Sequence, residues 1–530
     1  MTAPAVAARA PADEPARIAA MAAKGMLVGY WAEVQGDGPA ILSPRGDRTY
    51  AELNANANRL LDYLRGRGLG AGSAVAILCG NVPEFIEAVV ACQRGGFRYT
   101  PVNWHLAPDE VAYILDDCEA EAWVVAAEFG DKVVGASGDL AKARLAVGGP
   151  IAGFEDYGAA LAGHPADDPD DPVLGKSMLY TSGTTGRPKG VVKDGVLVVL
   201  PQREGTRANY RRGDVQLLCG PAYHAAPLAF DIIIPLASGA AVLMMERFDP
   251  AQALALIEQH RVTHSHMVPT MFQRLLALPR EIRDAADTSS LRLIIHGAAP
   301  VTPEVKLAMI DWLGPVLYEY YASTEASANI GITSEEWLER PGSVGRLLPE
   351  FGAKVLDEAG EPCPPGVPGK VSFRQPAAGR VSYFKAEEKN REVFAGDYYT
   401  VGDIGYVDED GYLFLTGRSA ETIISGGVNI YPQEIDVVLE SHPAVRQSCT
   451  VGVPNSEWGE EVRGVVSLEP GYEPTPQLAD ALIQCARDSL AGYKVPRQID
   501  FVDEVPTSAA GKKERRKVRE PYWQDQTRAI

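Results

Sequence analysis

Four short apolar segments decide the fold class of this chain: Ala241-Val-Leu-Met-Met245, Thr263-His-Ser-His-Met267, Leu291-Arg-Leu-Ile-Ile295 and Val316-Leu-Tyr-Glu319. They recur about every 25 residues, and each predicts one short buried strand. The gaps hold three helical patterns, each opened by a proline at a plausible first helical position: Pro250–His260, Pro269–Leu278 and Pro303–Leu313. This alternation predicts a parallel sheet with helices packed on its faces and ligands bound at the carboxyl ends of the strands.

The same alternation occurs upstream, so a second sheet is expected. Strands are predicted at Ala74–Cys79 and Ala122–Ala126, with helices at Pro83–Arg94 and Pro108–Asp117 between them. The predicted fold class is therefore α/β, with a large N-terminal domain of two doubly wound sheets.

The pattern of predicted secondary structure changes in the last third of the sequence. From about Gly342, short strand patterns broken by Gly and Pro predict a β-rich subdomain. Beyond Gly417-Arg418, an α+β pattern of about 110 residues is long enough for a separate small domain. The predicted organisation is a loose N-terminal tail (1–24), an N-terminal domain (25–417), a hinge (418–421) and a C-terminal domain (422–530).

Composition excludes several classes of protein. The chain has 530 residues, too many for one hydrophobic core, and its 46% hydrophobic and 23% charged residues are typical of globular proteins. No apolar run is long enough to cross a bilayer, and the Ala- and Pro-rich N-terminus lacks a secretory signal, so we expect a cytoplasmic protein without an integral membrane segment. The net charge of −20 argues against a nucleic-acid partner. Seven dispersed cysteines predict buried thiols rather than disulfides or a zinc cluster.

The segment Met178-Leu-Tyr-Thr-Ser-Gly-Thr-Thr-Gly-Arg-Pro-Lys-Gly190 predicts a phosphate-binding loop behind a strand. Glycines let backbone amides face an anion, hydroxyls add donors, and a lysine adds a positive charge. The spacing is not that of a Walker loop. A solvated turn is the alternative, and the density of donors argues against it. The predicted phosphate ligands are Thr181, Ser182, Gly183, Thr184, Thr185, Gly186 and Lys189.

Tyr180–Gly190 resembles the signature loop of the adenylate-forming (AMP-binding) enzyme superfamily. This superfamily includes acyl-CoA synthetases, aryl-CoA ligases, firefly luciferase and the adenylation domains of peptide synthetases. Further matches follow in the family's order from about residue 45 to 519, and they favour the acyl-CoA synthetase branch, whose members ligate fatty or aryl acids to CoA. The resemblance implies ATP, Mg²⁺ and coenzyme A as cofactors, and a small C-terminal domain that is mobile.

The segment Tyr318-Glu-Tyr-Tyr-Ala-Ser-Thr-Glu325 follows the last predicted strand. It offers an aromatic ring, a hydroxyl and a carboxylate where ligands of such folds bind. The resemblance implies that Tyr321 stacks on adenine, that Thr324 contacts the α-phosphate and that Glu325 holds Mg²⁺. Ala326 departs from the glycine that is usual in the family after this glutamate.

Two further motifs resemble nucleotide contacts of the family. In His296-Gly-Ala-Ala-Pro300, the resemblance implies that Gly297, Ala298 and Ala299 line the adenine and acyl pockets. In Thr400-Val-Gly-Asp403 and Gly417-Arg418, it implies that Asp403 binds the ribose hydroxyls and that Arg418 contacts the nucleotide. A carboxylate accepts hydroxyl protons well, and a guanidinium donates to phosphate oxygens as a planar fork.

The resemblance also assigns the acid and thiol steps. His224 is expected beside the substrate carboxylate, and Lys512 matches the mobile lysine that reaches the carboxylate and the α-phosphate. A solvated basic tail is the alternative for the segment around Lys512. We expect His264 and His266 to be structural, because further metal ligands are not evident. Three residues of the C-terminal domain are expected to contact coenzyme A: Trp458, Lys494 and Arg497.

These expectations predict an AMP-forming acyl-CoA ligase. The enzyme would activate a carboxylic acid as acyl-AMP, release pyrophosphate and transfer the acyl group to coenzyme A. Transfer to an amine or to a separate carrier protein is the alternative within the family, and a nucleotide-binding regulatory protein is the alternative outside it. Small residues in the expected acid pocket hint at a roomy apolar site for a fatty or bulky aryl acid. The acid itself and the oligomeric state, a homodimer among the options, stay open.

Overall fold

Proline and capping residues begin the helices where the sequence predicts them, and buried β-branched strands fill the intervals. In the computed structural model, α8 (Pro250–His260) begins behind the N-cap Asp249 and α11 (Pro303–Leu313) behind the N-cap Thr302. The structure describes residues 14–181, 188–195, 198–325, 330–347, 352–375, 380–394, 396–418, 421–425, 428–455, 458–490, 492–508 and 511–524.

The chain forms two compact units, each built from separate stretches of sequence. The first unit comprises Met1–His266, Ala286–Leu293 and Ala377–Lys385, and the second comprises Met267–Ala285, Ile294–Pro376 and Ala386–Ile530. The predicted domain boundaries, including the hinge at 418–421, stay predictions.

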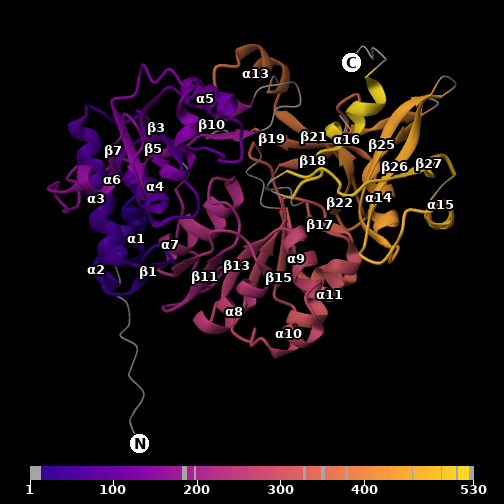
Figure 1. Cartoon of the computed structure of the whole chain (residues 1–530), viewed down its shortest axis with the longest axis horizontal. Helices are drawn as coiled ribbons and strands as arrows, with labels where there is room; N and C mark the ends of the chain where they lie inside the picture. Colours follow the sequence, from indigo (N-terminus) through magenta and orange to yellow (C-terminus); the bar gives the residue numbers. More distant parts are fainter. Residues whose placement is uncertain are drawn as a thin grey trace, which may run out of the picture. The chain divides into compact units, whose positions relative to one another are not determined.

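The first unit contains a six-stranded parallel sheet in the order β7-β6-β5-β3-β4-β8. Its strands lie among helices α3, α4 and α6 in Figure 1. The bounds are β3 (Ala74–Leu78), β4 (Arg98–Pro101), β5 (Ala120–Ala126), β6 (Ala143–Val147), β7 (Glu155–Asp156) and β8 (Lys176–Ser177). Every residue of β3 is buried, as expected of a strand that is covered on both faces.

The first unit also carries strands of a second sheet, in the order β13-β11-β12-β1-β2. All neighbours are parallel except β1 and β2. The bounds are β1 (Pro39–Leu42), β2 (Arg48–Thr49), β11 (Val215–Leu218), β12 (Ala241–Met244) and β13 (His264–Met267). A small antiparallel sheet joins β9 (Leu179–Thr181), β10 (Lys189–Lys193) and β20 (Val381–Tyr383).

Helices of the first unit cover these sheets. α3 begins with a capping box between Thr49 and Glu52, and α4 ends at Gly96, whose φ of 73° suits the left-handed helix cap. Their bounds are α1 (Glu14–Ala22), α2 (Leu27–Gln35), α3 (Tyr50–Gly66), α4 (Pro83–Gly95), α5 (Pro108–Asp117), the 3₁₀ helix η1 (Ala127–Val133), α6 (Tyr157–Leu161), the π-helix η2 (Pro227–Ile233), α7 (Ile234–Ser238) and α8.

The second unit contains β14 (Leu293–His296) and β15 (Leu317–Tyr321), which are parallel, and β16 (Ile330–Thr333), which is antiparallel to β15. A five-stranded antiparallel sheet has the order β17-β22-β21-β19-β18 and corresponds to the β-rich region that the sequence predicts. Its strands are β17 (Ser343–Arg346), β18 (Ala353–Leu356), β19 (Gly369–Arg374), β21 (Tyr398–Val407) and β22 (Tyr412–Arg418).

The C-terminal part of the second unit has its own sheet and core. Its strands are β23 (Ile423–Ser425), β24 (Val428–Ile430), β25 (Val445–Asn455), β26 (Gly459–Leu468) and β27 (Gln498–Phe501). Helices α14 (Pro432–Glu440) and α15 (Pro476–Ser489) contribute buried Ile435, Leu439 and Leu482 to its core. The remaining elements are α9 (Pro269–Leu276), α10 (Arg280–Ala285), α12 (Ser334–Glu339), α13 (Glu387–Val393), α16 (Arg515–Arg519) and the 3₁₀ helices η5 (Gly492–Lys494) and η6 (Glu520–Trp523). We refer to residues 422–524 as the C-terminal lobe.

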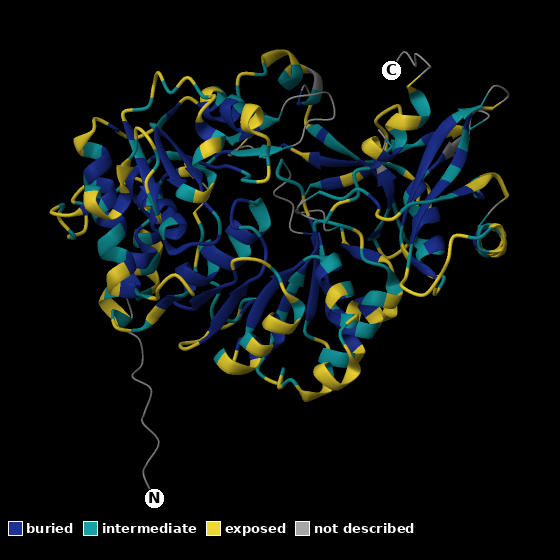
Figure 2. Cartoon of the chain, viewed as in Figure 1, coloured by how far each residue is buried: buried dark blue, intermediate teal, exposed yellow. Residues whose placement is uncertain are grey.

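Burial follows the expected pattern. Buried residues run through the strands, whereas α8, α10 and α11 carry exposed residues on their outer faces (Figure 2). The cysteines form no disulfide, and five of the seven are buried, which agrees with the prediction of buried thiols. Among the described residues, no helix combines the length and the apolar character that crossing a membrane requires.

Candidate functional site

In the first unit, the two ends of the predicted phosphate loop lie side by side. Thr181 closes β9, Lys189 opens β10, and the two residues are antiparallel partners. The Lys189 Nζ lies 5.5 Å from the centre of the Tyr383 ring, which places a cation over an aromatic face. Tyr180 donates a hydrogen bond of 2.5 Å to the Asp117 Oδ2 and so anchors the incoming strand. The predicted loop ligands Ser182, Gly183, Thr184, Thr185 and Gly186 lie outside the described residues.

His224 follows the carboxyl end of β11, where ligands of parallel sheets bind. Its main-chain N–H donates to the Pro221 carbonyl (3.1 Å), and its carbonyl accepts from the Leu228 N–H (3.0 Å). The residue is half-buried and begins the turn that leads into η2. A π-helix is an uncommon element that recurs near functional sites.

Two histidines on β13 are held by packing. The His264 Nε2 lies 2.6 Å from the Ala208 carbonyl oxygen, and its Nδ1 lies 2.8 Å from the Thr263 Oγ1. Burial lowers the pKa of His264 to about 4 and that of His266 to about 3, so both rings are neutral near pH 7. The described residues contain no cluster of three or more His, Cys, Asp or Glu side chains that could hold a metal ion.

The buried carboxylate of Asp231 lies next to these histidines and belongs to none of the sequence motifs described above. Asp231 on η2 is fully buried, and its Oδ1 accepts hydrogen bonds from the Gln216 side chain (2.5 Å) and the His266 N–H (3.0 Å). A single acidic residue within the otherwise apolar run Pro227–Ile234 is the only sequence feature that could have pointed to it.

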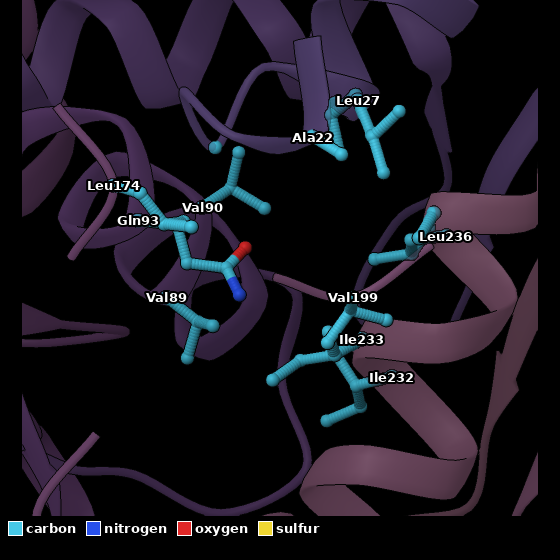
Figure 3. Close-up of a pocket in the computed structure, with 13 residues that line it drawn as sticks. Ala22, Leu27, Val89, Val90, Gln93, Leu174, Val199, Ile232, Ile233 and Leu236 are labelled. Atoms are coloured by element: carbon cyan, nitrogen blue, oxygen red, sulfur yellow. The ribbon is translucent and has the colours of Figure 1, made fainter. Parts of the chain in front are cut away.

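The first unit also contains a small apolar cavity of about 50 Å³. Figure 3 shows Val89, Val90 and Gln93 of α4 facing Ile233 and Leu236, with the Gln93 amide as the polar group among apolar side chains. None of the predicted site residues lines this cavity, so we assign it to packing around α4 and α7.

In the second unit, β14 ends at a tight contact with β15. A Cβ atom at Gly297 would lie 2.6 Å from the Tyr320 carbonyl oxygen, so only glycine fits at that position. The next residue, Ala298, has a φ of 65°, a left-handed conformation that is rare outside glycine. Backbone strain of this kind is concentrated at functional sites. Ala299 follows and is half-buried.

The structure brings Tyr321 and Asp403 together. The Tyr321 hydroxyl at the end of β15 donates a hydrogen bond of 2.7 Å to the Asp403 Oδ2 on β21. Both residues are buried, with exposures of 8% and 7%. The backbone of Arg418 on β22 is the antiparallel partner of Asp403, so these two predicted nucleotide ligands lie on adjacent strands.

Thr324 and Glu325 follow Tyr321 and are half-buried. The Glu325 main-chain carbonyl accepts a hydrogen bond of 3.0 Å from the Tyr399 hydroxyl, which fixes the backbone that carries the carboxylate. One carboxylate, completed by phosphate oxygens and water, is an ordinary donor set for Mg²⁺. The residues present therefore fit this ion.

Lys512 is exposed on a short turn of the C-terminal lobe. The Ser508 N–H donates to the Lys512 carbonyl (2.7 Å), and the Lys512 N–H donates to the Ser508 Oγ (3.2 Å). Gly511 has a φ of 72°, and a Cβ there would lie 2.6 Å from the Thr270 Oγ1 at the start of α9. The Lys512 turn therefore lies against α9 in the same unit as Tyr321, Glu325 and Asp403.

The three predicted coenzyme A contacts lie at separate points of the C-terminal lobe. Trp458 is 49% exposed at the β25–β26 turn, where its main-chain N–H donates to the Asn455 Oδ1 (2.9 Å). Arg497 is exposed before β27, and its N–H donates to the Val462 carbonyl (2.9 Å). Lys494 forms an ion pair with Glu434 in the first turn of α14. The lobe thus offers an exposed aromatic ring and an exposed guanidinium, whereas the Lys494 ammonium is engaged by a carboxylate.

The chain is similar to known proteins along most of its length. The family model "AMP-binding enzyme" matches residues 29–383, and the model "AMP-binding enzyme C-terminal domain" matches residues 434–512. The chain is 32% identical over 506 residues to a fatty acid–[acyl-carrier-protein] ligase of Streptomyces coeruleorubidus, covering 93% of this chain and 95% of that protein. It is 34% identical over 473 residues to a feruloyl-CoA synthase of Amycolatopsis sp, covering 88% and 92%.

A solved structure shares the fold along nearly the whole chain. The amide bond synthetase from Marinactinospora thermotolerans superposes with a TM-score of 0.79 at 28% identity and covers 94% of this chain and 100% of its own. The fold class that the sequence predicts is confirmed. The chain belongs to the AMP-binding family of adenylate-forming enzymes.

Proposed function

We propose that the protein is an ATP-dependent acyl-CoA ligase of the AMP-forming type. The observation that supports this proposal most directly is the buried hydrogen bond between Tyr321 and Asp403, in the same unit as Thr324, Glu325 and Lys512. These side chains match, in kind, what a nucleotide and a carboxylate need: a ring for adenine, a carboxylate for ribose, a carboxylate for a cation, and a lysine for the reacting anions.

In the first half-reaction, a substrate carboxylate oxygen attacks the α-phosphorus of ATP. The bond from that phosphorus to the bridging oxygen breaks, and pyrophosphate leaves with the electron pair. Two anions approach each other in this step, so charge must be neutralised at the α-phosphate. Lys512 and Thr324 would donate to the reacting oxygens, and the loop from Thr181 to Lys189 would hold the outer phosphates. Mg²⁺ on Glu325 would supply further charge neutralisation when bound.

In the second half-reaction, a thiolate sulfur attacks the acyl carbon and the bond to the AMP oxygen breaks. His224 would orient first the carboxylate and then the thiol, since a half-buried imidazole can donate or accept a hydrogen bond. Trp458 and Arg497 would contact coenzyme A from the C-terminal lobe, and Lys494 would join them on exchange of its pair with Glu434. The resemblance implies that rotation at 418–421 separates the two steps.

The acceptor of the acyl group is the part of the proposal for which alternatives exist. One relative acylates a carrier protein, one carries the name of a CoA synthase, and one structural neighbour is an amide bond synthetase. Transfer to a carrier protein or to an amine is therefore the second candidate. Mass spectrometry of the products that form from ATP, an acid and each acceptor in turn distinguishes the three.

Carboxylate-dependent exchange between ATP and pyrophosphate tests the first half-reaction without any acceptor. A panel of fatty and aryl acids would define the acid at the same time. Lys512→Ala should reduce exchange by at least about a hundredfold, as expected on loss of one charge-stabilising donor. Thioester formation from preformed acyl-adenylate should largely survive. Lys517→Ala is the matched control, because Lys517 is 64% exposed and pairs with Glu514, three residues away on the same short helix segment. Absence of exchange with every acid would refute the proposal.

A further inference from the structure

The residues that follow Lys512 are anchored in the C-terminal lobe by side chains that are largely buried. Lys512 is exposed, but the side chain of Lys513 is only 25% exposed and that of Arg515 only 9%. Thr507 and Lys513 form an antiparallel bridge, and the Glu514 N–H donates to the Pro506 carbonyl (2.8 Å). Neighbouring residues of an extended segment point to opposite sides, so an inward Lys513 requires an outward Lys512.

Lys513 is held by two carboxylates of α14. Its Nζ lies 2.6 Å from the Glu440 Oε1 and 3.5 Å from the Asp436 Oδ2. Burial alone would lower the pKa of Lys513, but Asp436 and Glu440 raise it above its usual value. The lysine is therefore charged at neutral pH and belongs to a salt bridge, so it is not available as a second catalytic lysine.

Arg515 connects Asp436 to β25 and to Glu421, the residue that directly precedes the lobe. Its Nη2 donates to the Asp436 Oδ2 (2.9 Å), its Nη1 to the Thr450 carbonyl (2.6 Å) and its Nε to the Glu421 Oε2 (3.0 Å). Three directed bonds from one planar guanidinium fix its orientation. Glu421 is the last residue of the predicted hinge 418–421, so the contact ties the Lys512 segment to the entrance of the lobe.

We propose that Lys513 and Arg515 are positioning residues for Lys512. Their salt bridges fix the backbone from which Lys512 projects, and the pair with Glu421 makes the Lys512 turn move as one body with the exit of the hinge. This inference rests on the proposed function, since it assigns Lys512 to adenylation. A misplacement of a reacting group by about 1 Å can cost about a hundredfold in rate, so the placement of the backbone that carries Lys512 affects the reaction.

The test measures two half-reactions on each variant at the same folded fraction. Lys513→Met should lower the kcat of pyrophosphate exchange about tenfold, with the KM for ATP and for the acid changed by less than about twofold. Thioester formation from preformed acyl-adenylate should stay within about twofold of the wild type, and Lys513→Arg should restore most of the exchange.

Arg463→Met provides the matched control in the same lobe. Arg463 is 16% exposed, and its Nη1 lies 3.2 Å from the Asp500 Oδ2. Its removal should lower the Tm by an amount similar to that caused by Lys513→Met, but leave exchange per folded molecule unchanged. Equal exchange in Lys513→Met and Arg463→Met would overturn the inference. An equal loss of both half-reactions in Lys513→Met would overturn it as well.

Glu421→Gln keeps the inference testable if Lys513→Met does not fold. Glu421 is 35% exposed, so its substitution should be tolerated. We expect exchange to fall about threefold through loss of one charge-assisted bond, with thioester formation unchanged. Unchanged exchange in Glu421→Gln would refute the link to the hinge. If the wild type shows no pyrophosphate exchange with any acid, the proposed function fails. If the wild type does exchange and the variants leave that exchange unchanged, only the present inference fails.

Discussion

Asp231 in the first unit and Asp436 in the C-terminal lobe are two buried aspartates in opposite electrical surroundings. Their exposures are 0% and 1%. Asp231 accepts from an amide side chain and from a main-chain N–H, and within the described part of the chain its Oδ2 has no hydrogen-bond partner. The His266 Nδ1 lies 3.8 Å from this oxygen. Asp436 accepts from the Thr450 N–H (2.6 Å) and faces two cations, Lys513 and Arg515.

The two sites shift the carboxyl pKa in opposite directions. Burial raises the pKa of Asp231 well above its usual value and outweighs the hydrogen bonds from the Gln216 side chain and the His266 N–H, which lower it. Burial would raise the pKa of Asp436 as well, but Arg515 and Lys513 outweigh it and lower the pKa. Equal burial therefore produces a carboxyl that favours its proton in one unit and an ionised carboxylate in the other. The number of facing cations decides which form persists.

Asp436→Asn should give the largest effect of this comparison. The substitution removes the carboxylate that Lys513 and Arg515 share, although Lys513 keeps Glu440 and Arg515 keeps Glu421. Loss of one member of a buried ion pair costs about 3–5 kcal/mol. Urea unfolding at pH 7, followed by the fluorescence of the tryptophans, would measure it. A loss of less than about 1 kcal/mol would mean that Lys513 and Arg515 find water or other carboxylates, and the contrast with Asp231 would disappear.

Lys306→Met should cause an intermediate loss of stability, because it removes the one lysine that faces Glu319, whereas Asp436 faces two cations. The Lys306 Nζ lies 2.5 Å from the Glu319 Oε2, and both side chains are at least 92% buried, with exposures of 0% and 8%. Burial lowers the pKa of Lys306 and raises that of Glu319, so the stranded carboxyl can take up a proton. We expect a loss of about 2–3 kcal/mol in free energy of unfolding. The double variant Lys306→Met/Glu319→Gln should recover part of it; a fully additive loss would argue against coupling.

Asp231→Leu should cost about 2 kcal/mol. The substitution involves no ion pair, and it leaves two buried donors, the Gln216 amide and the His266 N–H, without their acceptor. Thermal unfolding of Asp231→Leu and Asp436→Asn under the same conditions would show which substitution costs more stability. A larger loss in Asp231→Leu than in Asp436→Asn would reverse the order that the facing cations predict.

Asp231→Asn should have the smallest effect, and its sign depends on pH. The folded pKa of Asp231 is raised, so its contribution to stability is fully present below the unfolded pKa of about 4 and is lost as pH rises through the folded pKa. An asparagine does not ionise. The free energy of unfolding of the variant should lie within about 1 kcal/mol of the wild-type value at pH 4. At higher pH the variant should become more stable relative to the wild type.

Asp436 provides the opposite pH dependence for the same experiment. Its folded pKa is lowered, so its contribution is present above the unfolded pKa and is lost as pH falls through the folded pKa. Unfolding curves between about pH 3 and 9 for the wild type and both asparagine variants separate the two effects. Parallel curves for Asp231→Asn and the wild type would contradict a raised pKa at Asp231.

Local sequence was sufficient for the elements that carry their own signal. Pro250, Pro269 and Pro303 begin helices as predicted, and the apolar segments after Ala241 and Thr263 are strands. The helix α10, Arg280–Ala285, was not predicted, because it has no buried residue and hence no apolar periodicity. The phosphate loop and the segment that ends at Glu325 stand out because each motif is contiguous.

Pairs between distant residues could not be predicted in the same way. Tyr321 and Asp403 were placed in one site only by resemblance, and their hydrogen bond joins residues 82 positions apart. Arg515 and Glu421 are separated by 94 positions, and the segments that contain them give no sign that the two side chains pair. Lys494 looks available in the sequence, but its partner Glu434 lies 60 positions earlier. Only the tertiary structure shows which charges already have a partner.

The return of the chain to the first unit at 377–385 has a consequence for biosynthesis. Val191 in β10 pairs with Tyr383 in β20, the Lys385 Nζ lies 3.1 Å from the Glu119 Oε1, and the Arg98 guanidinium lies 4.5 Å from the centre of the Phe384 ring. A nascent chain that has passed residue 266 on the ribosome therefore still lacks the strand that completes the edge of β10. Until about 120 further residues emerge, that edge is open to wrong partners, and slow translation of this stretch would prolong its exposure.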